Sequence, residues 1–156
     1  MPHIALFEPE IPPNTGNIAR LCAATNTPLH LIGRLGFRLD ERSLRRAGLD
    51  YWDAVQIHRH DSYPDFEKAW VDGGGDLQRI FALTKTGSTL YTQVQYREND
   101  CLLFGSETRG LPPEMISRFG DRALAIPMPS GKVRSLNLAT ATGIVLYEAL
   151  RQLSNR

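Results

Sequence analysis

Apolar residues fall into short runs that are separated by longer stretches with helical spacing. Most of the runs are nearly all apolar, which predicts buried strands. The expected strands cover residues 4–7, 29–32, 55–58, 79–83, 101–104 and 123–126. The expected helices cover residues 16–26, 41–47, 63–70, 112–118 and 138–153. This alternation predicts an α/β fold with a mainly parallel sheet flanked by helices.

The order of these elements also suggests where a ligand would bind. The sequence has no repeat, linker or low-complexity tract, so we expect one domain over residues 1–156. In a parallel sheet of this kind, a ligand binds beyond the carboxyl ends of the strands. Three polar segments, 14–20, 102–111 and 126–137, follow or contain the end of an expected strand. We therefore expect them to converge on one site.

Composition narrows the class of protein without identifying an activity. The hydrophobic fraction of 42% and the charged fraction of 22% are typical of a globular protein. The sequence has no secretory signal pattern and no apolar run near the ~20 residues that span a bilayer. We therefore expect a cytoplasmic protein with no membrane partner, in which Cys22 and Cys101 are reduced core residues.

The distribution of charge says more than its total. A net charge of +1 argues against a protein that merely coats nucleic acid. One short region is nevertheless rich in arginine, namely Arg34, Arg38, Arg42, Arg45 and Arg46. Such a patch suits a phosphate-bearing partner, although a solvated charged face explains it equally well.

The first polar segment, 14–20, combines a candidate helix cap with an arginine. Asn14 can cap the helix that follows, since asparagine is a favoured residue at that position. Arg20 near a helix start, where N–H groups are free, suits a phosphate. On this segment alone, a plain cap with a surface arginine is the simpler interpretation.

The second polar segment, 102–111, places two glycines around a polar loop after a buried strand. Gly105 and Gly110 would let a ligand approach the backbone closely. The spacing resembles a P-loop, but Leu111 stands where that motif requires lysine, so ATP chemistry is not expected. Glu107 and Arg109 could equally form a simple ion pair.

The third polar segment, 126–137, begins with prolines and ends in polar residues. Ser135 and Asn137 stand immediately before the last expected helix, where side chains cap and N–H groups are free. Capping explains one of these two residues but not the whole segment.

Taken together and in order, the three segments resemble the motifs of the SPOUT class of methyltransferases. The patterns are N-x-G-N-[IV]-x-R at 14–20, F-G-x-E-x-x-G-[LI] at 104–111 and I-P-M…S-[LM]-N-[LV] at 126–138. The resemblance covers the whole chain and is closest to the minimal tRNA (cytidine/uridine-34) 2′-O-methyltransferases. Residues 8–17 and 44–51 look especially like that subgroup.

The resemblance implies a cofactor and a fold feature that periodicity cannot predict. Members of the class bind S-adenosylmethionine in a C-terminal trefoil knot, whereas true knots are almost absent from other proteins. The residues that would contact the cofactor are Leu83, Gly105, Ile126, Ser135 and Leu136. The third motif departs from many relatives, which have Leu or Val and then Ser-Asn where this chain has Leu138-Ala139-Thr140.

The resemblance also implies the reaction, methylation of the ribose 2′-hydroxyl of the wobble nucleotide in tRNA. The candidate catalytic residues are Arg20, Glu107 and Asn137. A charged guanidinium cannot accept a proton, so we expect Arg20 to hold a phosphate and to stabilise developing negative charge. Glu107 would orient Arg20 or, less simply, act as the base. Asn137 would position the ribose or its loop.

The expected partners follow from the same resemblance. A loop nucleotide can be splayed out, so the RNA partner would be the anticodon stem-loop of tRNA. The candidate RNA contacts are Asn17, Arg42, Arg45 and Arg46. Relatives form homodimers through the knotted region, and the apolar segment 138–153 fits such an interface or a buried core helix.

No metal is expected, because no group of residues has metal-ligand spacing. His58 and His60 could lie on one face of a strand, but a surface pair explains them more simply.

Three other functions remain open. The first is a SPOUT methyltransferase acting at another RNA position, such as an rRNA ribose. The second is a non-catalytic RNA-binding module that keeps the fold, against which the intact Arg20, Gly105, Ser135 and Asn137 argue. The third is an ordinary nucleotide- or flavin-binding protein, although the chain lacks G-x-G-x-x-G and a proper P-loop.

Overall fold

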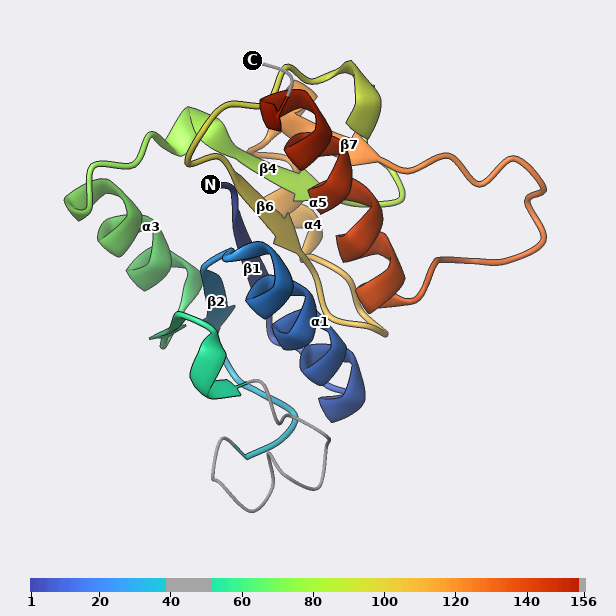
Figure 1. The fold of residues 1–156 in the computed structure, drawn as a ribbon. Coiled ribbons are helices and arrows are strands. Elements are labelled where there is room, and N and C mark those ends of the chain that lie inside the picture. Colours follow the sequence, from blue (N-terminus) through green and yellow to red (C-terminus); the bar gives the residue numbers. More distant parts are fainter. Residues whose placement is uncertain (39–51, 155–156) are drawn as a thin grey trace.

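The computed structural model describes residues 1–38 and 52–154 (Figure 1). The described strands are β1 (His3–Phe7), β2 (Leu29–Ile32), β3 (Ile57–His60), β4 (Ile80–Leu83), β5 (Thr89–Leu90), β6 (Cys101–Phe104) and β7 (Ala123–Ala125). The α-helices are α1 (Pro12–Thr25), α3 (Tyr63–Asp72), α4 (Pro113–Ile116) and α5 (Leu138–Ser154). Short 3₁₀ turns cover Trp52–Ala54, Leu77–Arg79, Tyr91–Gln93 and Gly120–Arg122.

The described strands form one sheet in the order β3-β2-β1-β6-β4-β7-β5. Every strand pair in it is parallel. The residues of β2, β4 and β6 are buried along their whole length, as expected where helices cover both faces of a parallel sheet. The prediction of a mainly parallel α/β sheet is therefore confirmed.

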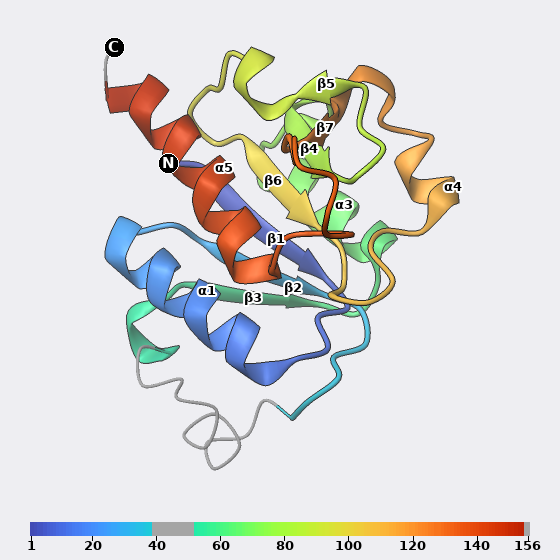
Figure 2. The same cartoon turned by 90° about the vertical axis from the view of Figure 1, so that its right-hand side faces the viewer.

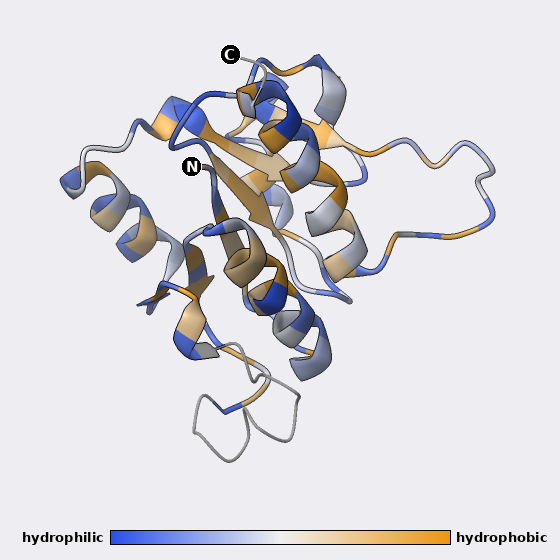
Figure 3. Cartoon of the chain, in the orientation of Figure 1, coloured by the Kyte–Doolittle hydropathy of each residue, from blue (hydrophilic) through white to orange (hydrophobic). Residues whose placement is uncertain are grey.

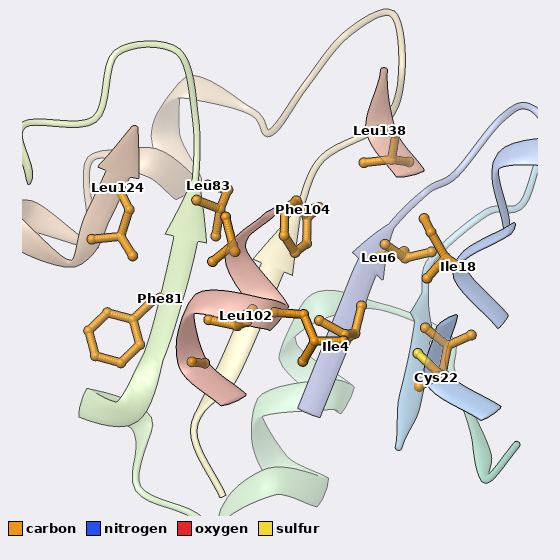
Figure 4. Close-up of a cluster of buried hydrophobic side chains, with 14 of the residues drawn as sticks. Ile4, Leu6, Ile18, Cys22, Phe81, Leu83, Leu102, Phe104, Leu124 and Leu138 are labelled. Atoms are coloured by element: carbon orange, nitrogen blue, oxygen red, sulfur yellow. The ribbon is translucent and has the colours of Figure 1, made fainter. Parts of the chain in front are cut away.

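Two hydrophobic layers lie on opposite faces of the sheet. Alternate residues of β1 show this, since Ile4 and Leu6 pack with α1 and α5 while Ala5 packs with α3 and α4. Figure 4 shows the first layer, and Figure 3 shows that apolar residues concentrate in the central strands. Cys22 lies in the first layer and Cys101 in the second, so both are core residues as predicted.

The observed elements differ from the predicted ones in four places. Helix α1 begins at Pro12 rather than at residue 16, because prolines fit a first turn whose N–H groups need no intrahelical partner. Strand β3 lies two residues later than predicted, and α4 is shorter. Strand β5 was not predicted, since two residues at a sheet edge leave no periodic pattern. The expected helix at 41–47 lies outside the described residues.

The strand order reverses between the neighbouring strands β1 and β6. Strands β2 and β3 follow β1 in the chain and lie on one side of it, whereas β6 lies on the other side. The loops after β1 and β6 therefore meet at a topological switch point, where ligands bind in sheets of this type. Figure 2 shows both strands ending toward the same side. Within the described part of the chain, no helix is long and apolar enough to cross a membrane.

Candidate active site

Glu107 lies at the centre of a hydrogen-bond network at this switch point. Its Oε1 accepts a hydrogen bond from the backbone N–H of Glu10 at 2.9 Å. Its Oε2 accepts from the backbone N–H of Ile11 at 2.6 Å and from the side-chain amide of Asn14 at 3.2 Å. The carboxylate thus accepts hydrogen bonds from groups at the start of α1. The helix dipole also favours a negative charge at this end of the helix. These contacts fit a group that holds α1 in place better than one that removes a proton.

Two asparagines extend the network to the last helix. The side-chain amide of Asn137 donates to Oδ1 of Asn14 at 3.0 Å. Oδ1 of Asn137 accepts from the backbone N–H of Thr140 at 3.2 Å, so Asn137 caps α5. The predicted capping at the start of α5 is therefore confirmed for Asn137. Asn14 does not cap α1, because it lies inside the first turn and is buried.

The predicted convergence of the three polar segments is confirmed by these contacts. Glu107 and Asn14 are separated by 93 residues in sequence, and Asn137 and Asn14 by 123. We call the hydrogen bonds among Glu10, Ile11, Asn14, Glu107 and Asn137 the loop network. It joins the loop after β1, the loop after β6 and the start of α5.

Arg20 and Asn17 lie on one exposed face of α1, three residues apart. Arg20 is more than two helical turns beyond Pro12. The expectation that it lies beside the free N–H groups of the helix start is therefore wrong, because the helix begins earlier than predicted. Of the arginine-rich region, Arg34 and Arg38 are exposed, whereas the candidate RNA contacts Arg42, Arg45 and Arg46 lie outside the described residues.

The candidate cofactor residues are placed by three neighbouring strands. Leu83 ends β4, Gly105 follows β6, and Ile126 follows β7. Since β6, β4 and β7 are adjacent in the sheet, these three residues lie at one edge of it. Leu83 is almost fully buried and Ile126 is half-buried. Figure 4 shows Leu83 and Phe104 at neighbouring strand ends.

The segment between β7 and α5 carries the remaining cofactor candidates, Ser135 and Leu136. It extends away from the body of the molecule before it returns to α5 (Figure 1). Ser135 is exposed and Leu136 is half-buried. Both residues stand close to Asn137, so the cofactor candidates adjoin the loop network.

Gly105 is required by the chain's own backbone. A Cβ at this position would lie 2.2 Å from the carbonyl carbon of Gly110 and 2.3 Å from the backbone nitrogen of Leu111. The loop folds back here through a bridge between Ser106 and Gly110. The sequence suggested that the missing side chain of Gly105 leaves space for a ligand. The backbone of Gly110 and Leu111 occupies that space instead.

Sequence reasoning did not single out some residues that shape this edge. A Cβ at Gly87 would lie 2.4 Å from the carbonyl carbon of Leu124, so the loop after β4 passes directly against β7. Glu10 and Thr108 also join two of the converging loops, through a hydrogen bond of 2.7 Å between the Thr108 hydroxyl and the Glu10 carboxylate. A lone glycine or threonine in a polar stretch carries no signal for such long-range contacts.

A second polar cluster lies on the sheet face covered by α3. The histidine cluster consists of His30 and three histidines that stack on it, namely His3, His58 and His60. Nδ1 of His3 lies 3.0 Å from Nε2 of His30, and Nδ1 of His30 lies 3.0 Å from Nε2 of His60. The expectation of a surface pair at His58 and His60 is wrong, since both are half-buried against His30.

Burial controls the charge of this cluster. It lowers the pKa of His30 from 6.5 to about 3 and that of His3 to about 4, with smaller contributions from neighbouring histidines and, at His3, the N-terminus. Phe66 and Trp70 cover the rings edge-on. Across the described ranges, no group of three or more His, Cys, Asp or Glu side chains is arranged to hold a metal ion.

Comparison with known proteins identifies a matching family and similar proteins. The sequence profile of the SpoU rRNA Methylase family matches residues 1–147. The tRNA (cytidine(34)-2′-O)-methyltransferase of Yersinia pestis is 49% identical over 154 residues, which cover 98% of this chain and 94% of that protein. A solved structure from work on the 2-OH methylation of C/U34 on tRNA matches with a TM-score of 0.89 and 51% identity, covering 100% of this chain and 98% of that one.

A more distant neighbour was solved with a cofactor. The AdoMet-bound rRNA methyltransferase from Sinorhizobium meliloti matches with a TM-score of 0.80 and 31% identity. The match covers 97% of this chain and 56% of the neighbour. The shared fold therefore extends to a structure that holds S-adenosylmethionine.

Proposed function

The chain belongs to the SpoU rRNA Methylase family, and we propose that it methylates the ribose 2′-hydroxyl of nucleotide 34 in tRNA. The observation that carries the proposal is the identity of 49–51% to relatives with this specificity over nearly the whole chain. The methyl donor is S-adenosylmethionine, as in the related AdoMet-bound enzyme. A tRNA substrate also fits a cytoplasmic enzyme, and we infer that residues 1–156 act as one domain.

The residues at the edge of β6, β4 and β7 fit this cofactor. Leu83 and Ile126 offer apolar surface for an adenine ring, and the loops around Gly105 and Ser135 offer backbone and hydroxyl groups for its polar parts. When bound, the cofactor supplies a sulfonium methyl group that a hydroxyl oxygen can attack in line with the sulfur. We further infer that this part of the chain forms the trefoil knot of the class.

The protein must place the hydroxyl and stabilise the charge that develops on it. Arg20 is permanently protonated, so it serves as a clamp for the neighbouring phosphate rather than as a base. A phosphate oxygen or a water molecule then receives the proton. Glu107 acts on this step indirectly, because it holds the start of the helix that carries Arg20. Asn137 links that helix to the loop beside the cofactor site.

The RNA would be the anticodon stem-loop, in which a splayed nucleotide can reach the site. Asn17 and Arg20 form its contact on α1, and Arg42, Arg45 and Arg46 supply phosphate contacts. The proposed homodimer uses the knotted region and α5, on which Tyr147 is 54% exposed. A large exposed aromatic side chain on a helix rich in apolar residues is typical of an interface.

Methyl transfer to a tRNA transcript by the purified protein tests the function. Nucleoside mass spectrometry should locate a 2′-O-methyl group at position 34. Arg20→Ala should lower kcat/KM by about 10²- to 10³-fold, the range for loss of one charge-stabilising group. Arg118→Ala, which removes an arginine paired with Glu67 elsewhere on the surface, is the control.

Each result of that experiment has a clear meaning. Full activity of Arg20→Ala would remove Arg20 from the mechanism. Methylation of an rRNA fragment but not of tRNA would reassign the substrate. Absence of calorimetric binding of S-adenosylmethionine would favour an RNA-binding module.

A further inference from the structure

The loops after β1 and β6 exchange hydrogen bonds in both directions. The carboxylate of Glu107 accepts from the backbone N–H groups of Glu10 and Ile11. In return, the carboxylate of Glu10 accepts from the Thr108 hydroxyl at 2.7 Å and from the Thr108 backbone N–H at 3.4 Å. Each loop thus binds the carboxylate of the other. We call the Glu10–Thr108 contact, together with its Glu107 counterpart, the loop clasp.

The two loops belong to different halves of the proposed site. The loop after β6 begins at Gly105 and closes on itself, with the Gly110 N–H donating to the Ser106 carbonyl at 3.0 Å. This bond ties the two ends of the turn together. The loop after β1 leads directly into α1, which carries Arg20. The clasp therefore connects the cofactor side to the RNA side.

A third segment packs against the same residue. The Gly36 N–H donates to the Pro9 carbonyl at 2.9 Å. A Cβ on Gly36 would lie 2.7 Å from Cα of Glu10. The chain between Arg34 and Arg38, at the start of the arginine-rich region, therefore packs against the Glu10 backbone. Glu10 is therefore the meeting point of the cofactor loop, the start of α1 and this segment.

We propose that Glu10 is a positioning residue that couples cofactor binding to RNA binding through Thr108. This inference rests on the proposed function. A ligand that fixes the loop after β6 also fixes Thr108, and through Glu10 it fixes the start of α1 in the arrangement that RNA requires. Thermodynamic linkage then demands that RNA strengthen cofactor binding by the same factor.

Glu10 is better suited to this test than Glu107. Glu107 also holds Asn14 and the backbone N–H of Ile11, the residue before α1, so its loss would disturb the fold. The Glu10 carboxylate is bound by the other loop, and hydrogen bonds from Thr108 and then Ser106 lower its pKa. It therefore remains ionised at neutral pH and accepts from Thr108 throughout the working range.

Calorimetry on the full chain measures the coupling. The dissociation constant of S-adenosylmethionine is measured in the presence and in the absence of an anticodon stem-loop RNA. In the wild type, the RNA should tighten cofactor binding by about tenfold, within the usual range of coupling factors. Glu10→Ala, which removes the acceptor, and Thr108→Val, which removes the hydroxyl donor, should bring this factor close to one, while affinity for the cofactor alone changes less than about threefold.

Matched variants separate coupling from general damage. Thr108→Ser keeps the hydroxyl donor and should restore the wild-type factor. Glu114→Ala, which changes an exposed glutamate on α4, should leave it unaltered. The double variant Glu10→Ala/Thr108→Val should show the same factor as either single variant, because both remove the same side-chain contact.

The outcomes distinguish this inference from the proposed function. A coupling factor that is unchanged in Glu10→Ala and Thr108→Val, or that equals one in an active wild type, overturns the role of Glu10 alone. A wild type that binds neither ligand overturns the proposed function and this inference with it.

Discussion

The loop network and the histidine cluster are both polar, yet they obtain their partners differently. In the loop network, Glu107 and Asn137 bind groups 93 to 123 residues away in sequence, and many of these groups are backbone N–H. In the histidine cluster, the partners lie on the neighbouring strands β1, β2 and β3. One cluster thus depends on how loops meet, and the other on the register of the sheet.

The two clusters also differ in charge. Glu10 keeps its negative charge, since hydrogen bonds lower its pKa. Burial lowers the pKa of His3, His30 and His60 and favours their neutral forms, so each of the two N···N contacts among them contains one proton. His30 can donate to His60 while accepting from His3, or the reverse. The difference teaches that the charged carboxylates lie in the loops at the strand ends, whereas the neutral imidazole of His30 fills a core position.

The largest effect should come from Glu107, where positioning and base catalysis predict different results. Glu107→Ala leaves the N–H groups of Glu10 and Ile11 without their acceptor, so it should lower stability by about 2 kcal/mol. It should also lower kcat/KM by about 100-fold, which steady-state methylation assays would measure. Glu107→Gln keeps one acceptor oxygen and should lose only about tenfold.

The pH–rate profile provides the decisive control for Glu107. A positioning residue that is changed to glutamine leaves the shape of the profile intact. Equal loss in the alanine and glutamine variants, with a vanished inflection, would show instead that Glu107 removes the proton.

The histidine cluster should make stability, but not catalysis, sensitive to acid. The folded pKa values of His3 (about 4) and His30 (about 3) lie below the unfolded value of 6.5. The unfolded state therefore takes up protons first, so stability is full above pH 6.5 and is lost as the pH falls toward 4. We expect a loss of a few kcal/mol, about the size that two shifts of this kind produce.

Urea unfolding at several pH values checks this expectation. His30→Leu should reduce the pH dependence and leave kcat at neutral pH unchanged, because the histidine cluster lies on the sheet face covered by α3 and shares no residue with the loop network. The groups facing His30 and its neighbours are His3, His58, His60, Asp65 and the N-terminal amine. An equal slope in wild type and variant would mean that one of these, rather than His30, takes up the proton.

The same contrast explains how far the sequence predicts the fold. Strands β2, β4 and β6 are central in a parallel sheet, so they carry apolar residues at nearly every position and are readily identified. Strand β3 is misplaced by two residues because its histidines look like surface residues. They become half-buried because His30 packs against both of them and Phe66 of α3 packs against His60.

The candidate site, like the fold, can be predicted only in part from the sequence. The meeting of the three polar segments follows from parallel topology, because strand ends gather at one edge. The Asn137 cap follows from its place before α5. The Glu10–Thr108 contact does not follow, since the direction of a side chain in a loop is set by a partner 98 residues away and not by any period.

The smallest effect should come from Asn137, where the cap and the loop network can be separated. Asn137→Ala removes the acceptor for the Thr140 N–H and should cost about 1 kcal/mol, the usual value of an N-cap. Asn137→Ser keeps a cap but is too short to reach Asn14, so it should keep most of the stability. Both variants should lose activity by about tenfold, because both break the link to α1.

Thermal unfolding and methylation assays on the two variants complete this test. If activity follows stability, with the serine variant fully active, then Asn137 matters only as the cap of α5. If both variants lose activity equally while only the alanine variant loses stability, the bond between Asn137 and Asn14 itself positions the site. That result would place Asn137 with Glu107, as a residue that acts on the reaction through α1.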